Sequence, residues 1–146
     1  MSSAQKLFHK KGQNISFGWN DDQRSYVLIK MVREGIPYHD FSAVSSLSPF
    51  TLKEWASFLN VSTRTLERHR EENKTFRQEQ SERILSIYQL LNYGVSVFGY
   101  KEGFFDWLSA ESIALGGVKP KDLLDTSIGI NMVKDELGRL EHGILA

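Results

Sequence analysis

A short run of polar and charged side chains near the middle of the chain has the composition of a surface that contacts nucleic-acid bases. The segment TRTLERHR, residues 63–70, carries three arginines and one glutamate. An arginine can donate two hydrogen bonds to guanine, and a carboxylate can accept one from a cytosine amine. If this segment is a helix that enters a major groove, its exposed residues near the N-terminal end point at bases and phosphates. The residues predicted to contact DNA are Thr63, Arg64, Glu67, Arg68 and Arg70, with Lys74 beside them.

The elements that would position these side chains are two short helices joined by a tight turn. Asn60 stands where a left-handed turn residue is needed, and Ser62 can cap the following helix. The spacing resembles a helix-turn-helix in which Leu66 faces the core. The run 65–68 is similar to that of Xre-like recognition helices, although Asn60 replaces the usual glycine and His69 the usual apolar residue. The apolar positions of the first helix and the turn are Leu52, Trp55, Ala56, Leu59 and Val61.

Two simpler interpretations of this segment stay open. The alternating charges are also typical of a solvated helix face, and a helix-turn-helix can serve packing alone. DNA contact is therefore a hypothesis that depends on which side of the second helix is exposed.

Metal, thiol and covalent chemistry have little support in the sequence. There is no cysteine, and His9, His39, His69 and His142 are scattered without the close pairing of a metal site. No histidine is placed beside a carboxylate on a predicted adjacent turn, so we expect neither an enzyme nor a cofactor. Neither a signal peptide nor a long apolar run is present, which favours a cytoplasmic protein without a membrane partner.

The charge of the chain is balanced overall but uneven along it. The 146 residues carry 18 basic and 18 acidic side chains and are 40% hydrophobic, which is enough for one core or two small modules. Residues 1–50 have six basic and four acidic side chains, residues 51–83 seven and six, and residues 84–146 five and eight. The net charges are +2, +1 and −3, so an anionic partner is expected to meet the first half.

Helical patterns cover most of the remaining chain. Residues 1–19 are polar, with three lysines, and predict a flexible arm that is either solvated or touches DNA phosphate. Asn20 or Asp21 can cap a helix that ends before Gly35, a second helix is expected over 38–47, and the longest over 75–98. Five aromatic residues are predicted to be core rather than a ligand platform: Phe98, Tyr100, Phe104, Phe105 and Trp107.

The last quarter of the chain combines turn chemistry with a helical pattern. Gly116 and Gly117 permit backbone angles closed to other residues, and Pro120 suits the first turn of a short helix. Thr126 can cap a final helix that Gly143 ends. The apolar stripe of this helix comprises Ile130, Val133, Leu137, Leu140 and Ile144, and the four residues before Gly143 are expected to supply contact area for a partner.

This stretch resembles the toxin-binding domain of the Xre/MbcA/ParS antitoxin family. The family motif has Trp-Leu, then Leu-Gly-Gly-x-x-Pro, then Leu-Leu-Asp-Thr, and a last helix punctuated by glycine. The matching residues here are Trp107-Leu108, Leu115-Gly116-Gly117, Pro120, Leu123-Leu124-Asp125-Thr126, Gly129, Val133, Leu137, Arg139 and Gly143.

The resemblance implies an all-α antitoxin with three parts. These are a flexible N-terminal arm (1–19), an Xre-like helix-turn-helix module (20–74), and a connecting helix with a small helical toxin-binding module (75–146). Such a protein would bind and inhibit a RES-domain toxin that consumes NAD, and would regulate its own operon by binding DNA. A homodimer within a larger complex is expected, because one helix-turn-helix reads only a short half-site. The alternative is a helix-turn-helix transcription regulator whose C-terminal module dimerises or senses a ligand.

The resemblance also implies which residues contact the toxin. The C-terminal end of the family's last module helps to obstruct the toxin active site, and the short apolar tail here fits that role. The alternative for the tail is simple fraying, which is common at chain ends. The predicted toxin-binding residues are Leu115, Gly116, Gly117, Pro120, Asp125, Thr126, Arg139, Gly143, Ile144, Leu145 and Ala146.

Overall fold

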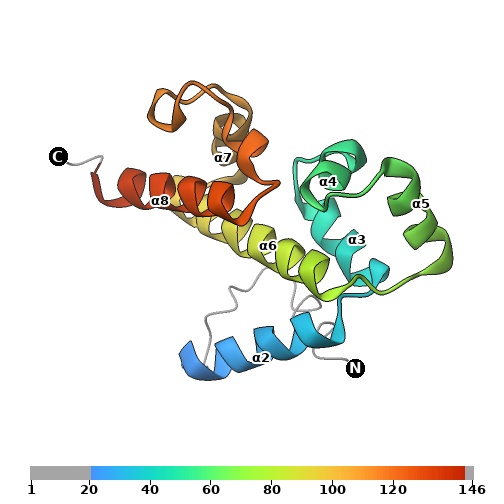
Figure 1. Ribbon diagram of the computed structural model, residues 1–146. Coiled ribbons are helices and arrows are strands. Elements are labelled where there is room, and N and C mark those ends of the chain that lie inside the picture. Colours follow the sequence, from blue (N-terminus) through green and yellow to red (C-terminus); the bar gives the residue numbers. More distant parts are fainter. Residues whose placement is uncertain (1–20, 144–146) are drawn as a thin grey trace. The chain divides into compact units, whose positions relative to one another are not determined.

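The computed structural model describes residues 21–143 of the chain (Figure 1). The expected arm at 1–19, the Asn20 cap and the tail residues Ile144, Leu145 and Ala146 lie outside this range. All regular elements between 21 and 143 are helices, so the predicted all-α fold is confirmed. None of these helices combines the length and apolar character needed to cross a membrane. The chain forms two compact units, one ending at Leu85 and the other beginning at Ser86.

The first unit contains the predicted pair of short helices and the helices around them. Gly35 ends the first helix with a φ of +84°, as its position predicted. The longest helix begins at Gln78 and not at Thr75, so that expectation was wrong by three residues. Thr75 instead pairs with Pro37 in an isolated bridge, where Phe76 N–H donates to Ile36 O at 2.8 Å. The elements are α2 (Asp21–Glu34), α3 (Tyr38–Leu47), α4 (Leu52–Phe58), α5 (Thr63–Glu72) and the beginning of α6 (Gln78–Phe98).

Aromatic side chains form the centre of this unit. Trp55 of α4 is fully buried and meets Phe41 of α3 edge to face, with ring centroids 5.1 Å apart. The Trp55 Nε1–H donates to Ser48 Oγ at 3.1 Å, so the indole is buried without losing its polar partner. Phe50 packs against Trp55 from the segment that connects the two helices. Each aromatic ring therefore joins elements that are adjacent in the chain but would otherwise expose apolar faces.

The second unit is built from the rest of α6 and four shorter elements. Phe104 is fully buried, and its ring lies where a side chain at Gly94 of α6 would have to be. Phe98 and Trp107 surround it and are partly exposed, with centroids 5.8 Å and 6.1 Å from the Phe104 ring. Tyr100 was wrongly assigned to the core, because it is 59% exposed and its ring lies beside Gly103. The remaining elements are α7 (Lys101–Ser109), the 3-10 helices η1 (Ile113–Leu115) and η2 (Pro120–Leu123), and α8 (Ser127–Gly143).

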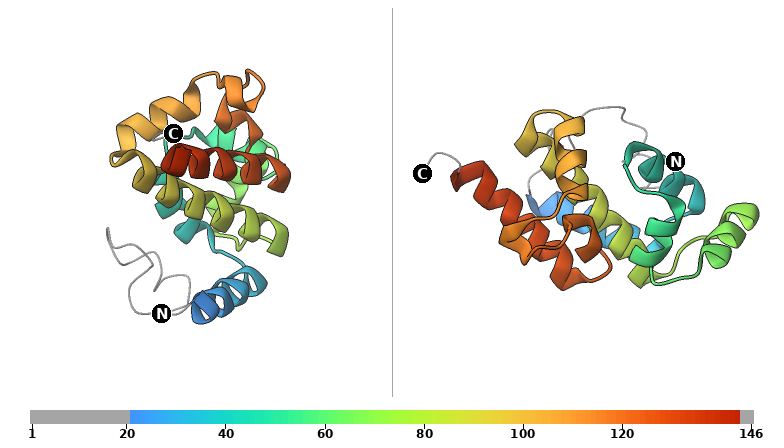
Figure 2. Two further views of the ribbon diagram at one scale, coloured as in Figure 1. Left: turned by 90° about the vertical axis from the view of Figure 1, so that its left-hand side faces the viewer. Right: turned by 90° about the horizontal axis from the view of Figure 1, so that it is seen from above.

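The beginning of α8 is held against η2 at very short range. Thr126 Oγ1 accepts a hydrogen bond from Gly129 N–H at 2.9 Å, which confirms the predicted cap. A Cβ atom at Gly129 would lie 1.8 Å from the backbone oxygen of Leu123. Glycine at this position thus permits an approach that any side chain would block. Further along, α8 lies beside the second half of α6 (Figures 1 and 2), where Tyr93 OH donates to Glu141 Oε2 at 2.5 Å.

Two glycines of α8 therefore predict opposite effects of the same substitution. We expect Gly129→Ala to lower the free energy of unfolding by about 1–3 kcal/mol, because the new methyl group overlaps backbone that cannot move aside cheaply. We expect Gly138→Ala to raise it by about 0.5–1 kcal/mol through helix propensity, since its Cβ would meet only Tyr93 OH at 3.6 Å. Urea unfolding of the full chain measures both. Two stabilising substitutions would show that the close approach of α8 and η2 does not exist.

Candidate functional site

The turn between α4 and α5 is specified by residues at both of its ends. Thr51 accepts from Glu54 N–H and Glu54 Oε1 accepts from Thr51 N–H, a capping box that begins α4. Asn60 adopts the predicted left-handed conformation, with φ of +55°. Val61 N–H donates to Ala56 O at 3.0 Å across the turn, which is the bond of a Schellman motif that spans more residues. Ser62 accepts from Thr65 N–H at 3.0 Å and caps α5 as predicted.

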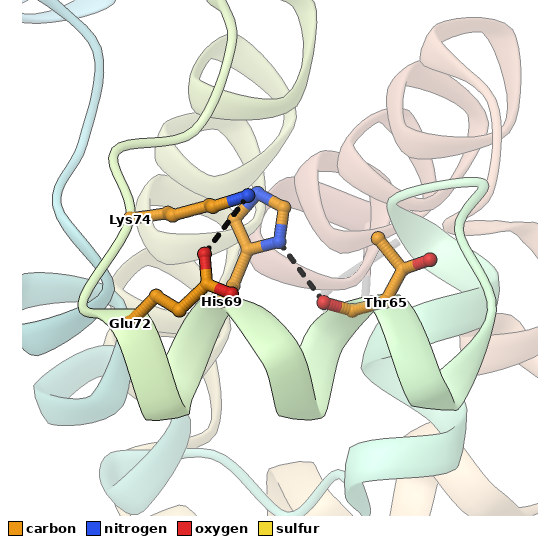
Figure 3. Close-up of polar contacts among 4 residues, drawn as sticks. All are labelled: Thr65, His69, Glu72 and Lys74. Carbon is orange, nitrogen blue, oxygen red and sulfur yellow. Dashed lines mark hydrogen bonds and ion pairs between the residues drawn. The ribbon is translucent and has the colours of Figure 1, made fainter.

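The buried side of α5 explains how histidine is accommodated where helix-turn-helix motifs usually have an apolar residue. Leu66 is fully buried, and the His69 ring stacks on Phe76 with centroids 4.9 Å apart and an interplanar angle of 15°. The His69 Nδ1 atom lies 3.0 Å from Thr65 O, and Figure 3 shows this bond running along the helix. A carbonyl only accepts, so this contact places the ring hydrogen on Nδ1. The ring therefore supplies an apolar face while its Nδ1 atom is satisfied within α5.

The C-terminal end of α5 is closed by asparagine and lysine. Asn73 has a φ of +45°, and Lys74 N–H donates to His69 O at 3.0 Å. Lys74 Nζ also forms an ion pair with Glu72 at 3.0 Å (Figure 3), and both side chains are about half exposed. Lys74 was expected to flank a DNA contact, and it lies at the far end of α5 from Thr63.

The opposite side of α5 carries most of the side chains predicted to contact DNA. At about 100° per residue, Arg64, Glu67 and Arg68 fall within an arc of about 100°, centred opposite Leu66 and His69. All three are exposed, and among the side chains described, those of residues 25–143, none of them forms an ion pair or a side-chain hydrogen bond. Thr63 is exposed at the first turn of the same helix. These four side chains therefore share one free surface, the α5 charged face.

Arg70 lies apart from this face. It is about 40° around the helix from Leu66, although its side chain is exposed. Burial raises the pKa of the Tyr38 hydroxyl of α3, and the positive charge of Arg70 acts in the opposite direction. Arg70 is therefore close to α3 at the edge of the α5 charged face.

In the second unit, the two adjacent glycines shape an exposed loop. Gly116 and Gly117 have φ of +86° and +85°, and a Cβ at either position would meet nothing within 4 Å. The positive φ, and not a shortage of space, makes glycine suitable there. The loop is closed by Ser112 N–H donating to Val118 O at 2.9 Å and by Gly117 N–H donating to Ser112 O at 2.8 Å.

The other residues predicted to contact the toxin divide into buried and exposed groups. Leu115 and Pro120 are buried and support the loop and η2 from inside. Asp125 is exposed, whereas the exposed Thr126 uses its hydroxyl to cap α8. Arg139 is 63% exposed, and its Nη2 and Nε both lie 2.7 Å from one oxygen of the nearly buried Glu136 carboxylate. Its guanidinium therefore neutralises Glu136 while its remaining donors face outward.

A shallow groove beside the end of α8 brings Arg139 and Gly143 together. Tyr93 of α6 lines the same groove, and its hydrogen bond to Glu141 raises the pKa of the Tyr93 hydroxyl. The full lining comprises Tyr93, Lys134, Asp135, Gly138, Arg139, His142 and Gly143.

The expected role of the α8 apolar stripe as free contact area was wrong. Ile130, Val133 and Leu137 are buried inside the unit, because this side of α8 covers its core. Two residues that were not considered, Ile128 and Met132, are 76% and 41% exposed on another side of the helix. Their spacing of four residues is a sequence signal that could have identified them, since it places them on one line whose mean direction is about 150° from that of Ile130 and Val133.

The η1 segment adds another exposed apolar side chain that the motif did not indicate. Ile113 is 96% exposed, and Val118 at the other end of the glycine loop is 39% exposed. The second unit therefore presents several apolar side chains to solvent, which we call the exposed apolar set: Ile113, Val118, Ile128 and Met132.

Comparisons with known proteins agree with both halves of this description. Residues 27–87 match the family model for the antitoxin Xre-like helix-turn-helix domain, and residues 94–143 match that for the antitoxin Xre/MbcA/ParS C-terminal toxin-binding domain. Antitoxin Xre of Yersinia enterocolitica (serotype O:8 / biotype 1B) is 29% identical over 124 residues, 84% of each chain. Antitoxin Xre of Photorhabdus laumondii subsp. laumondii is 26% identical over 117 residues, 80% of this chain and 79% of the relative.

A third relative is slightly more similar in sequence than these two. The "Prs ADP-ribosylating antitoxin" of Sphingobium sp. (strain YBL2) is 30% identical over 127 residues, 81% of this chain and 80% of the relative. The helix-turn-helix and the C-terminal motif are thus recognised in the order in which the sequence predicted them. The chain belongs to the Xre/MbcA/ParS family of antitoxins.

Proposed function

We propose that this antitoxin inhibits a RES-domain toxin that consumes NAD, and that it represses its own operon by binding operator DNA as a homodimer. The toxin-binding family match over residues 94–143 supports the first part. The name of the Sphingobium relative refers to ADP-ribosylation, a transfer for which NAD is the usual donor, and this supports a partner that uses NAD. The second part, operator binding, is supported by the α5 charged face.

The exposed apolar set is the best candidate for the surface that grips the toxin. Ile128 and Met132 lie one turn apart on α8 and are free of the core that the other side of the helix covers. Exposed apolar side chains that neighbour each other, as these two do on α8, favour a protein partner. Covering one such side chain contributes about 1.5–3 kcal/mol when its burial is complete. The loop at Gly116 and Gly117 then offers backbone to the partner, and Asp125 and Arg139 offer polar contacts.

The end of the chain is proposed to act separately from this surface. Gly143 ends α8 and lies in the groove that Arg139 and Tyr93 also line. The tail Ile144–Ala146 that follows is short and apolar and is proposed to obstruct the toxin active site. Contact area and obstruction are then supplied by different residues.

Operator binding is proposed to use the N-terminal end of α5. A recognition helix directs its first exposed side chains at base edges, and Thr63, Arg64, Glu67 and Arg68 are exposed there without partners in the described chain. The edge position of Arg70 fits a phosphate contact better than a base contact. A second copy of the chain would supply the other half-site.

The toxin surface can be tested by replacing Ile128 and Met132 together with alanine. We expect affinity for the toxin encoded next to the antitoxin gene to fall by about 10- to 100-fold, because apolar area of each side chain no longer leaves water. Thermal unfolding of the free antitoxin should not change, since both side chains are exposed. Glu102→Ala is the control, at an exposed position of α7 that does not line the groove beside α8. Equal affinities for all three proteins would exclude Ile128 and Met132 from the interface.

The tail can be tested by deleting residues 143–146. We expect the truncated antitoxin to bind the toxin with nearly the parent affinity but to leave toxin NAD turnover largely uninhibited, because Ile128 and Met132 remain. Isothermal titration calorimetry and an NAD turnover assay with saturating antitoxin measure the two properties. Full inhibition by the truncated protein at saturation would contradict the obstruction.

The operator interface can be tested with Arg64→Ala and Arg68→Ala in one chain. We expect operator affinity to fall by at least about 10-fold, because each arginine contact with DNA contributes roughly 1–3 kcal/mol, while toxin inhibition stays intact. Lys30→Ala with Arg33→Ala removes the same charge from α2 and serves as the control. An unchanged electrophoretic shift for the α5 variant would rule out the recognition-helix assignment.

A further inference from the structure

The exposed side of α5 carries two pairs of like charges, and such pairs lower the stability of a helix. Arg64 and Arg68 are four residues apart, and so are Glu67 and Glu71. Like charges at this spacing face each other and destabilise an isolated helix. Arg64 also lies in the first turn, where the helix dipole favours a negative charge, and that turn contains no acidic residue.

The opposite charges that neighbour these residues on α5 are not joined to them by ion pairs. Glu67 is exposed and forms no ion pair or side-chain hydrogen bond with the described side chains of residues 25–143, although arginine precedes it by three residues and follows it directly. The only ion pair of α5 in that range joins Glu72 to Lys74 beyond its C-terminal end. The charged side chains in the first two turns of α5 therefore form no ion pair with the described residues. This fits contact with a partner outside the chain.

A carboxylate within a DNA-contacting face is unfavourable unless it meets a hydrogen-bond donor. Phosphate oxygens repel it, so Arg64 and Arg68 are suited to phosphate or guanine and Glu67 is not. In the major groove, guanine presents two acceptors and thymine one, whereas the cytosine amine presents a donor. Adenine presents a donor beside an acceptor, which a carboxylate meets less well.

We propose that Glu67 determines the sequence specificity of the operator complex by accepting a hydrogen bond from a cytosine amine in each half-site. The carboxylate selects cytosine by attraction and rejects guanine and thymine by repulsion of their acceptor atoms. Arg64 and Arg68 supply the attraction to DNA that allows an acidic side chain to approach the groove. This assignment rests on the proposed operator binding.

The test is selection of binding sites from a library of randomised DNA duplexes by the full-length protein. The parent is expected to select one strongly preferred G·C pair in each half-site, with the cytosine toward Glu67. Glu67→Gln is expected to replace that preference with A·T, because an amide pairs in two bonds with adenine. All other selected positions should stay the same. Glu71→Gln is the control, since it removes the same charge one turn further from the N-terminal end of α5 and should keep the parent consensus.

Fluorescence anisotropy with the selected duplexes then gives the magnitude. Replacing the preferred cytosine should weaken the parent by about 10- to 100-fold and Glu67→Gln by much less. Circular dichroism should show Glu67→Gln unfolding at the parent temperature or slightly above it, because a like-charge pair is removed. If Glu67→Gln selects the parent consensus, the specificity assignment is wrong although operator binding stands. If the parent itself selects no sequence, both the assignment and the proposed operator binding fail.

Discussion

The packing of Phe76 is the interaction on which the N-terminal unit depends. Its ring meets Phe41 and Tyr38 of α3, at centroid distances of 5.2 and 6.2 Å, and stacks on His69 of α5. Its backbone N–H donates to Ile36 O, and its carbonyl accepts from the buried Ser81 hydroxyl of α6 at 3.2 Å. One residue between two helices thus fixes the rotation of α5 about its own axis. That rotation decides which side chains of α5 face solvent, and the proposed DNA contact depends on it.

Two glycines allow the elements of the C-terminal unit to approach closely. Gly129 allows the first turn of α8 to touch the backbone of η2, and Gly94 allows α6 to touch the ring of Phe104. Because α8 lies so close to η2, the apolar side chains Ile130, Val133 and Leu137 are buried in the core of the unit. The remaining side of the helix, with Ile128 and Met132, stays exposed to solvent.

The two units offer partners different chemistry. The α5 charged face presents unpaired arginines and a glutamate, which suit a polyanion whose bases carry both donors and acceptors. The exposed apolar set of the second unit suits a protein surface that excludes water. The proposed DNA contact and the proposed toxin contact would therefore lie on separate modules.

Local chemistry made much of the fold and part of the candidate site predictable from the sequence alone. The left-handed turn at Asn60 and the caps at Ser62 and Thr126 were correct because capping and φ preferences act over two or three residues. For the same reason, glycine and proline in the sequence correctly predicted where α3 begins and ends and where α2 ends. The resemblance in the last quarter of the chain was equally visible, since its glycines and proline are rare residues at fixed spacing.

Tertiary structure decided the features that depend on distant segments. Whether Thr75 begins a helix or pairs with Pro37 depends on a segment almost forty residues away, and the partner of the His69 ring depends on Phe76 beyond the end of α5. Likewise, helical periodicity places Ile128 and Ile130 on different sides of α8 but does not say which side the core covers. That choice is made by the close contact at Gly129, because apolar side chains are buried only where another element can approach them.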